Sequence, residues 1–342
     1  MPRYLPEPDS SVVEHVETGV LLVNLGSPAA PTPRAVRAYL REFLSDPRVV
    51  ETPRALWLPI LHGVILNTRP RVSAAKYASI WTPEGAPLVV HTREQARYLR
   101  GYLGERGMAS IRVGWAMRYG KPGIREGLTR LKAAGARRVL VVPLYPQYAA
   151  STTASAMDAV CDWLRQTRNQ PEMLLLRDFH DDPGYIAALA DNVRRHRGPA
   201  PGNAVLVFSF HGLPQKSRIL GDPYFDQCQT TARLLAEALR LAAHEYRVAF
   251  QSRLGKEPWL QPYTAETLVS LARQGVRRVD IVCPGFVADC LETLEEIALS
   301  NRRLFLEAGG QYFRYIPALN ESPAWLAALA DLVEKRIRRG KD

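Results

Sequence analysis

The sequence predicts an α/β protein built from two similar halves, each a four-stranded parallel sheet flanked by helices. Two observations lead to this prediction. Short apolar runs alternate with helical patterns along the whole chain, as in parallel sheets that carry helices on both faces. The chain also repeats itself, because residues 128–143 resemble residues 268–284, with Gly135 and Gly275 at equivalent positions.

The predicted strands are short runs of Val, Leu, Ile and Phe bounded by Gly or Pro, the pattern of strands buried on both faces. We expect four in the first half, at 20–25, 111–117, 139–144 and 173–176, and four in the second, at 205–210, 247–251, 279–283 and 312–316. Helical patterns lie between them, at 34–44, 123–133, 185–195 and 227–243.

The repeat also sets the predicted domains. Arg118–Pro122 and Arg253–Pro258 each place a Gly-Lys element after a strand, ahead of the helix–glycine–strand repeat. Pro199–Gly202 breaks a helical pattern near the middle of the chain. We therefore expect a first domain at 1–185, a second at 186–320, and a C-terminal helix at 321–342 that packs on the first domain. Two such halves would face each other across a ligand cleft.

Composition excludes several classes of protein. The 342 residues are 46% hydrophobic and 23% charged, which is ordinary for a globular chain of two domains. Four cysteines without a CxxC pair fit reduced thiols, and the first 19 residues lack the apolar core of a signal peptide. The longest apolar stretch, 55–66, is shorter than the roughly 20 residues that span a bilayer. We expect a cytoplasmic protein, favour a monomer, and leave peripheral membrane contact open.

The net charge of +11 suggests an acidic partner, either an anionic membrane surface, nucleic acid or a carboxylate-bearing ligand. No zinc-finger spacing or RNA-binding strand motif occurs, so nucleic-acid binding is not expected.

His211 is the first candidate for chemistry. It ends an apolar strand, and Gly212 and Pro214 force a tight exit from that strand. Ligand sites of open α/β sheets form at the carboxyl ends of the strands, and a neutral imidazole accepts a proton or binds a metal near pH 7. A histidine that only makes a structural hydrogen bond at a strand end is the alternative.

Carboxylates follow the strand at 279–283. If a helix opens near Ala288, Asp289, Glu292 and Glu296 share one face, where a row of carboxylates can pass a cation inward or protons outward. Acidic residues that merely complement the dipole of a helix are the alternative. Aromatic side chains near several strand ends would together suit a large, flat, apolar ligand: Trp115, Tyr119, Tyr145, Tyr148, Trp259 and Phe286.

A series of motifs resembles the ferrochelatase family, in order from about residue 20 to 320. They are Asn24–Pro28, Phe43–Pro47, Pro143–Tyr148 with Ser151–Thr153, Ser209–Pro214, Gly221–Tyr224, Phe250–Arg253 with Pro258–Leu260, and Pro284–Glu296. The resemblance implies two Rossmann-like domains of the class II chelatase type. It also implies a lyase that inserts Fe(II) into protoporphyrin IX to form protohaem, the last step of haem biosynthesis, with release of two protons.

The resemblance also implies roles for residues. The family's active-site histidine and glutamate fall on His211 and Glu292, which are expected to act in catalysis and to contact the iron, with Asp289 and Glu296 as a proton or metal relay. The residues expected to bind porphyrin are Leu25, Arg118, Tyr119, Tyr148, Trp259 and Phe286. Fe(II) is a substrate, and no permanently bound cofactor is expected.

The chain departs from the family pattern in two places. Cys290 stands where many members have a histidine two residues before the glutamate, which favours the acidic row over a second imidazole as the relay. No cysteine follows Cys290, so the iron–sulfur cluster that some members hold on C-terminal cysteines cannot form in this chain.

Other functions share some of these features. A cobalt or nickel chelatase, or a chelatase acting on coproporphyrin, would use an active-site histidine in the same way. A non-catalytic tetrapyrrole carrier would need the ligand cleft but would not insert a metal. A metal-dependent hydrolase fits the histidine and carboxylates alone, but the chain offers no HxxxH or HxD ligand set.

Overall fold

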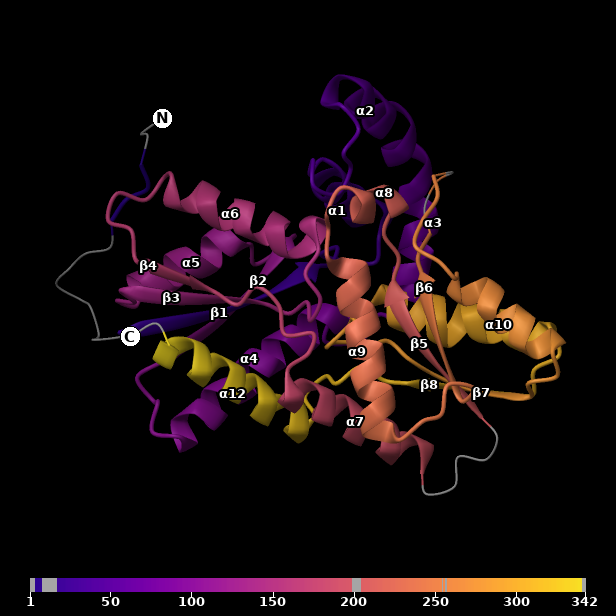
Figure 1. Cartoon of the computed structure of the whole chain (residues 1–342). Coiled ribbons are helices and arrows are strands. Elements are labelled where there is room, and N and C mark those ends of the chain that lie inside the picture. The colour runs from indigo at the N-terminus through magenta and orange to yellow at the C-terminus, as the bar shows by residue number, and fades with distance from the viewer. Residues whose placement is uncertain (1–3, 8–16, 199–203, 254, 256, 340–342) are drawn as a thin grey trace. The chain divides into compact units, whose positions relative to one another are not determined.

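The computed structural model describes residues 4–7, 17–198, 204–253, 255 and 257–339 (Figure 1). The predicted helix break at Pro199–Gly202 and the lysine of the second Gly-Lys element, Lys256, lie outside these residues. The chain forms two compact units. The first comprises Met1–Leu144, Ala150–Asp178 and Leu326–Asp342, and the second comprises Tyr145–Ala149 and Phe179–Trp325.

Each unit contains one parallel sheet of four strands, so the predicted fold class is confirmed. The first sheet has the order β2-β1-β3-β4, from β1 (Thr18–Gly26), β2 (Arg112–Tyr119), β3 (Arg138–Pro143) and β4 (Glu172–Leu175). The second has the equivalent order β6-β5-β7-β8, from β5 (Val205–His211), β6 (Tyr246–Gln251), β7 (Arg278–Val282) and β8 (Tyr312–Ile316).

The helices of the first unit include those that cover its sheet and a segment, residues 54–78, that packs on the first helix. They are α1 (Pro33–Leu44), α2 (Arg54–Ile60), α3 (Leu66–Ala78), α4 (Pro87–Glu105), α5 (Ile124–Ala133), α6 (Ser155–Leu164) and the part of α12 (Pro323–Arg339) from Leu326 on. Two π-helical segments, η2 (Leu61–Ile65) and η3 (Ala150–Ala154), continue directly into α3 and α6.

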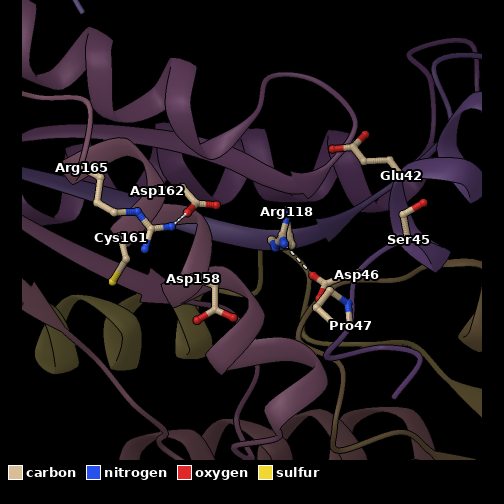
Figure 2. Close-up of a pocket in the computed structure, with 9 residues that line it drawn as sticks. All are labelled: Glu42, Ser45, Asp46, Pro47, Arg118, Asp158, Cys161, Asp162 and Arg165. Carbon is tan, nitrogen blue, oxygen red and sulfur yellow. Dashed lines mark hydrogen bonds and ion pairs between the residues drawn. The ribbon is translucent and has the colours of Figure 1, made fainter. Parts of the chain in front are cut away.

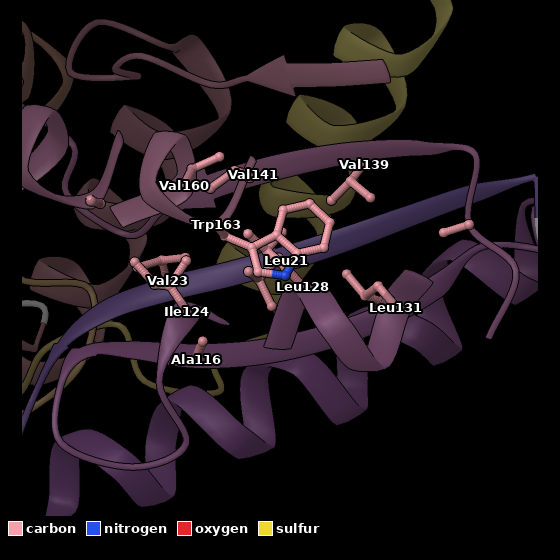
Figure 3. Close-up of a cluster of buried hydrophobic side chains, with 12 residues drawn as sticks. Leu21, Val23, Ala116, Ile124, Leu128, Leu131, Val139, Val141, Val160 and Trp163 are labelled. Atoms are coloured by element: carbon pink, nitrogen blue, oxygen red, sulfur yellow. The ribbon is translucent and has the colours of Figure 1, made fainter. Parts of the chain in front are cut away.

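Alternating residues of the central strand build the core of the first unit (Figure 3). Leu21 and Val23 point to the face that α5 and α6 cover, where they meet Leu128 and Trp163. All four side chains are buried, and each such burial contributes roughly 1.5–3 kcal/mol. The indole N–H of Trp163 has a hydrogen-bond partner, because it donates to the hydroxyl of Thr129 at 3.0 Å.

The second unit is covered in the same way by α7 (Pro183–Arg197), α9 (Tyr224–Leu239), α10 (Thr264–Arg273), the π-helix η4 (Glu292–Asn301) and α11 (Arg302–Glu307), with the short α8 (Gln215–Ile219) after β5. Its core brings Val207 and Ile281 of the sheet against Leu268 of α10 and Ile297 of η4. The π-helix is therefore anchored to the sheet through its apolar side.

The unit boundary lies after Asp178, earlier than the boundary predicted after residue 185. The reason is an aromatic cluster within the second unit, where the ring of Phe179 packs on Tyr185 and Trp325 with centroids 5.3 and 5.6 Å away. The final helix, by contrast, contacts the first unit, where Arg106, the residue after the end of α4, pairs with Asp331 at 2.6 Å and with Glu334 at 3.1 Å.

The internal repeat extends further than the sequence comparison indicated. Helices α7 and α12 both begin with Pro and share the run Ala-Ala-Leu-Ala-Asp, at 187–191 and 327–331. Gly135 and Gly275 both have positive φ, 94° and 89°, at the turn into the third strand of each sheet.

The predicted pairing of the two Gly-Lys elements is wrong. In the first unit the N–H of Met117 bonds to the carbonyl of Pro122, five residues on. The corresponding bond in the second unit joins Phe250 to Pro262, twelve residues on, so Pro262 and not Pro258 is equivalent to Pro122. The second unit thus carries additional residues between β6 and α10.

Candidate active site

His211 ends β5 in the second unit and is fixed by its backbone neighbours. It pairs with Gln251 at the end of β6, and the next N–H, of Gly212, donates to the Gln251 carbonyl at 2.8 Å. The hydroxyl of Tyr224 donates to the His211 carbonyl at 2.9 Å. The imidazole itself is half-buried and meets the ring of Phe286 edge-on, with centroids 6.3 Å apart.

Gly212 is needed for this tight exit. A Cβ atom there would lie 2.6 Å from the Gln251 carbonyl oxygen and 3.1 Å from the ring of Trp259. Of the two predicted porphyrin contacts, Trp259 therefore lies beside Gly212, and Phe286 lies beside His211. Both are half-buried, with part of each ring left for a ligand.

The acidic residues lie differently from the predicted row. No helix opens near Ala288, because Asp289 and Cys290 lie in a loop and the π-helix η4 begins at Glu292. Its i→i+5 bonding makes a wider turn than an α-helix, and such segments occur often at functional sites. Glu292 and Glu296, four residues apart, belong to this π-helix, and Asp289 does not.

Glu296 interacts electrostatically with both His211 and Glu292. Burial raises the pKa of its carboxyl group above the ordinary value, and the negative charge of Glu292 acts in the same direction. Hydrogen bonds from Ser252, and the positive charge of His211 when it is protonated, act against it. His211, Glu292 and Glu296 are therefore close enough to interact electrostatically within one unit.

Asp289 is instead tied into the loop that leads to η4. Its carboxylate accepts from the hydroxyls of Tyr315 at 2.5 Å and Thr293 at 2.9 Å, and from the amide of Asn320 at 2.7 Å. The N–H of Ala318 adds a longer bond, at 3.3 Å. A buried carboxylate that is held by four donors braces this loop, which corrects its predicted place in a row with Glu292 and Glu296.

The buried thiols of the site are neutral. Burial raises the pKa of Cys283 and of Cys290 well above the ordinary value, and the carboxylate of Glu292 raises that of Cys290 further. Where many family members have a histidine, this chain thus presents a protonated thiol to Glu292. The described residues contain no group of three or more His, Cys, Asp or Glu arranged to hold a metal ion.

A second polar cluster lies at the strand ends of the first unit (Figure 2). Arg118 donates from Nη2 to Asp46 at 2.6 Å and from Nε to the Ser155 hydroxyl at 2.7 Å. Asp46, Arg118 and Pro47 line a pocket of about 460 Å³ that also includes Asp158 of α6.

Tyr119 completes this cluster but offers no surface to a ligand. It is fully buried, and its hydroxyl lies 2.8 Å from Asp46 and 3.0 Å from Ser155. Tyr119 therefore supports Arg118 and Asp46, which corrects its prediction as a direct porphyrin contact. Leu25, also of the first unit, and Tyr148, of the second, are half-buried.

Asp46, Ser155 and Ser252 are among the residues of these networks that were not predicted. Asp46 and Ser252 lie within motifs that carry the family resemblance, but single polar residues in loops form no periodic pattern. Only their contacts in the structure reveal what they hold.

Comparison with known proteins decides the family. The family model described as Ferrochelatase matches residues 17–337. The ferrochelatase of Dechloromonas aromatica (strain RCB) is 58% identical over 340 residues, covering 98% of this chain and 92% of the relative. That of Aromatoleum aromaticum is 59% identical over 337 residues, with the same two coverages. The chain belongs to the ferrochelatase family.

Membership confirms the predicted activity, a lyase that inserts iron into protoporphyrin in haem biosynthesis. Solved structures support the fold alone. SirB from Bacillus subtilis with Fe3+ has a TM-score of 0.58 at 15% identity and covers 95% of this chain and 97% of its own. DR2241 from Deinococcus radiodurans has a TM-score of 0.52 at 15% identity, covering 96% of this chain and 56% of its own.

Proposed function

We propose that His211 and Glu292 carry the metal insertion and that Glu296 relays protons or the incoming ion. The single observation that supports this assignment is that the end of β6 contacts all three residues. Gln251 pairs with His211 and donates to the Glu292 carbonyl at 2.9 Å. The next residue, Ser252, donates to Glu296 at 2.7 Å. A neutral imidazole at His211 accepts a proton from a pyrrole nitrogen, so that the N–H bond breaks and the nitrogen lone pair becomes free for Fe(II). Glu292 offers a carboxylate oxygen to the hard ferrous ion.

Binding energy from the flanking aromatic rings supports this chemistry. Trp259 and Phe286 lie beside the His211–Gly212 turn and offer flat apolar surface to the macrocycle. Contacts with the rest of the ring can distort it, which exposes the nitrogen lone pairs to the metal. Tyr148, Leu25 and Arg118 are the further contacts that we propose. Asp289 acts indirectly, by bracing the loop before η4.

The assignment is tested by His211→Ala and Glu292→Gln. Each variant should lose at least about 100-fold in turnover of Fe(II) and protoporphyrin, while porphyrin still binds with quenching of its fluorescence. Two control variants replace the same types of residue outside the proposed mechanism, so that general effects on folding or charge can be recognised. Glu295→Gln changes a carboxylate on the same π-helix, and His196→Ala removes a histidine whose Nδ1 contacts the Asn192 carbonyl on α7. Near-normal turnover in either test variant removes that residue from the mechanism.

We also propose that α2, η2 and the start of α3 lie on an anionic membrane surface. No helix in the described ranges is long and apolar enough to cross a membrane. Leu56, Ile60 and Val64, spaced four residues apart, are exposed by 63%, 45% and 54%. Leu61 and Leu66 face inward, where they pack against Leu44. The helical segment thus has one anchored and one exposed apolar side, as interfacial helices do.

Charge supports the same proposal. Residues 52–83 contain no Asp or Glu, and they include Arg54, Arg69, Arg71 and Lys76. Each basic residue near an anionic bilayer contributes about 1 kcal/mol, and salt screens this attraction. Sedimentation with phosphatidylglycerol vesicles at low and high salt tests the proposal. Leu56→Glu should release the protein, and Ile219→Glu, which changes an even more exposed apolar residue of the second unit, should not. Absence of wild-type binding at low salt would end the proposal.

A further inference from the structure

Ser252 has an unusual backbone conformation. It follows the last residue of β6, and its φ is +67°, in the left-handed region that residues other than glycine rarely adopt. Within the described part of the chain, Arg240 and Asn320 are the other non-glycine residues with positive φ. Such a conformation persists where the surrounding contacts determine it, and it often marks a functional site.

Both hydrogen-bond donors of Ser252 are directed to one carboxylate. Its N–H donates to Oε1 of Glu296 at 2.7 Å, and its hydroxyl donates to Oε2 at 2.5 Å. One residue therefore occupies both oxygens of Glu296 and fixes the plane of the carboxylate. Bonds of this kind to a charged acceptor are short and roughly twice as strong as bonds between neutral groups.

The residue before Ser252 holds the same helix one turn earlier. The side-chain amide of Gln251 donates from Nε2 to the backbone carbonyl of Glu292 at 2.9 Å. Its Oε1 accepts from the hydroxyl of Ser209 at 2.7 Å. Two consecutive residues at the end of β6 thus fix η4 at Glu292 and at Glu296.

The shared fold of the two units does not require this arrangement. Ser252 lies within the stretch between β6 and α10 that is longer in the second unit than its counterpart after β2. In the first unit, the equivalent stretch runs only from Gly120 to Gly123 before α5 begins. The contact to Glu296 is therefore a feature of the unit that contains His211 and Glu292.

We propose that Ser252 is a positioning residue that holds the Glu296 carboxylate in one orientation beside His211 and Glu292 during metal insertion. This inference rests on the proposed function for its kinetic consequence, but the geometry that it predicts for Glu296 does not depend on activity. The left-handed conformation is the means by which a single residue provides both donors.

Three variants distinguish the contribution of the Ser252 hydroxyl to turnover from that of its backbone conformation. Ser252→Ala removes the hydroxyl and keeps the strained backbone, and Ser252→Gly removes the hydroxyl together with the constraint on φ. Both should lower kcat about tenfold, the effect of one hydrogen bond to a charged group, with the KM for porphyrin changed less than twofold. Ser252→Asn supplies a side-chain N–H donor in a residue that tolerates positive φ, and it should recover most of kcat.

The matched control is Ser300→Ala. It removes a hydroxyl that donates to Oε1 of Glu295 at 2.9 Å, a bond of the same kind on the same π-helix. Its kcat should equal that of the wild type. If Ser300→Ala were as slow as Ser252→Ala, the effect would be a general loosening of η4 and the proposal would fail. A slow Ala variant beside a normal Gly variant would assign the effect to the backbone and would also overturn it.

Crystal structures of the wild type, Ser252→Ala and Ser252→Gly provide the second measurement. The Glu296 carboxylate should occupy one orientation in the wild type and rotate or become disordered in both variants. An unmoved carboxylate in both variants overturns the proposal whatever the kinetics. If the carboxylate moves while Glu296→Gln keeps wild-type turnover, the positioning by Ser252 stands and the proposed relay role of Glu296 fails.

Discussion

Asp46→Asn should destabilise the protein by about 3 kcal/mol. The carboxylate of Asp46 is buried, with a side chain 5% exposed, and its partner Arg118 is 19% exposed. Breaking a buried ion pair by neutralising one member leaves the other charge uncompensated, which costs roughly 3–5 kcal/mol. We expect the lower end of this range because an asparagine side chain still accepts one of the present hydrogen bonds.

The pH dependence follows from the same contacts. Burial raises the pKa of Asp46, but the donors Ser155, the Arg48 N–H and Tyr119 outweigh it, with help from the charge of Arg118. The net pKa lies below the ordinary value, so Asp46 binds a proton less readily in the folded state than in the unfolded chain. Its contribution to stability is therefore complete above the unfolded value of about 3.9 and disappears as pH falls through the folded value.

Urea unfolding of the wild type and the variant at pH 7 and near pH 3 measures this directly. The difference in unfolding free energy should be about 3 kcal/mol at pH 7 and should shrink at the lower pH. Asp158→Asn is the control, since its ion pair with Arg48 is 40–49% exposed and should contribute less than about 1 kcal/mol. A loss below about 1 kcal/mol in Asp46→Asn would refute the reasoning.

Two further predictions concern the second unit. Gly212→Ala places a Cβ 2.6 Å from the Gln251 carbonyl oxygen, so turnover should fall at least about tenfold. Gly63→Ala, with open space around it, should not slow turnover. Equal rates for the two variants would contradict the claim that the turn after His211 requires glycine. Alkylation of the folded protein at pH 7, followed by mass spectrometry, should modify exposed Cys161 and spare Cys283 and Cys290, whose thiols are buried and protonated. Modification of Cys290 at the rate of Cys161 would show that its thiol is accessible.

The sheets were predictable where a strand is a short apolar run that ends within two residues of Gly or Pro. Val205–His211 and Arg278–Val282 are examples, and both agree with the predicted ranges to within a residue or two. The place of His211 at the end of β5 followed from the same reasoning, because ligand sites form at the carboxyl ends of parallel strands. Glu292 was singled out by the spacing of the carboxylates and by the family resemblance.

The π-helix was not predictable in the same way. Asp289, Glu292 and Glu296 have the spacing of an α-helical face, and nothing in their order signals a wider turn. Tertiary contacts favour the observed arrangement. The Gln251 amide donates to the carbonyl of Glu292, and the Tyr315 hydroxyl donates to Asp289 in the loop. Such side-chain to backbone contacts between distant segments leave no periodic trace in the sequence.

The repeat was partly detected for a related reason. The glycines at 135 and 275 stand out because a turn with positive φ favours glycine. The likeness of α7 and α12 is also present in the sequence, as the shared run Ala-Ala-Leu-Ala-Asp. The two Gly-Lys elements are not equivalent, because the stretch after β6 is longer than the stretch after β2.

A double-variant cycle tests the central assignment most directly. Turnover of Fe(II) and protoporphyrin is measured for His211→Ala, Glu292→Gln and the double variant under one set of conditions. Groups that act together on the same step lose their effect together, so the double variant should be no slower than the slower single variant. Losses that multiply would mean that the imidazole and the carboxylate work independently, and would contradict the account.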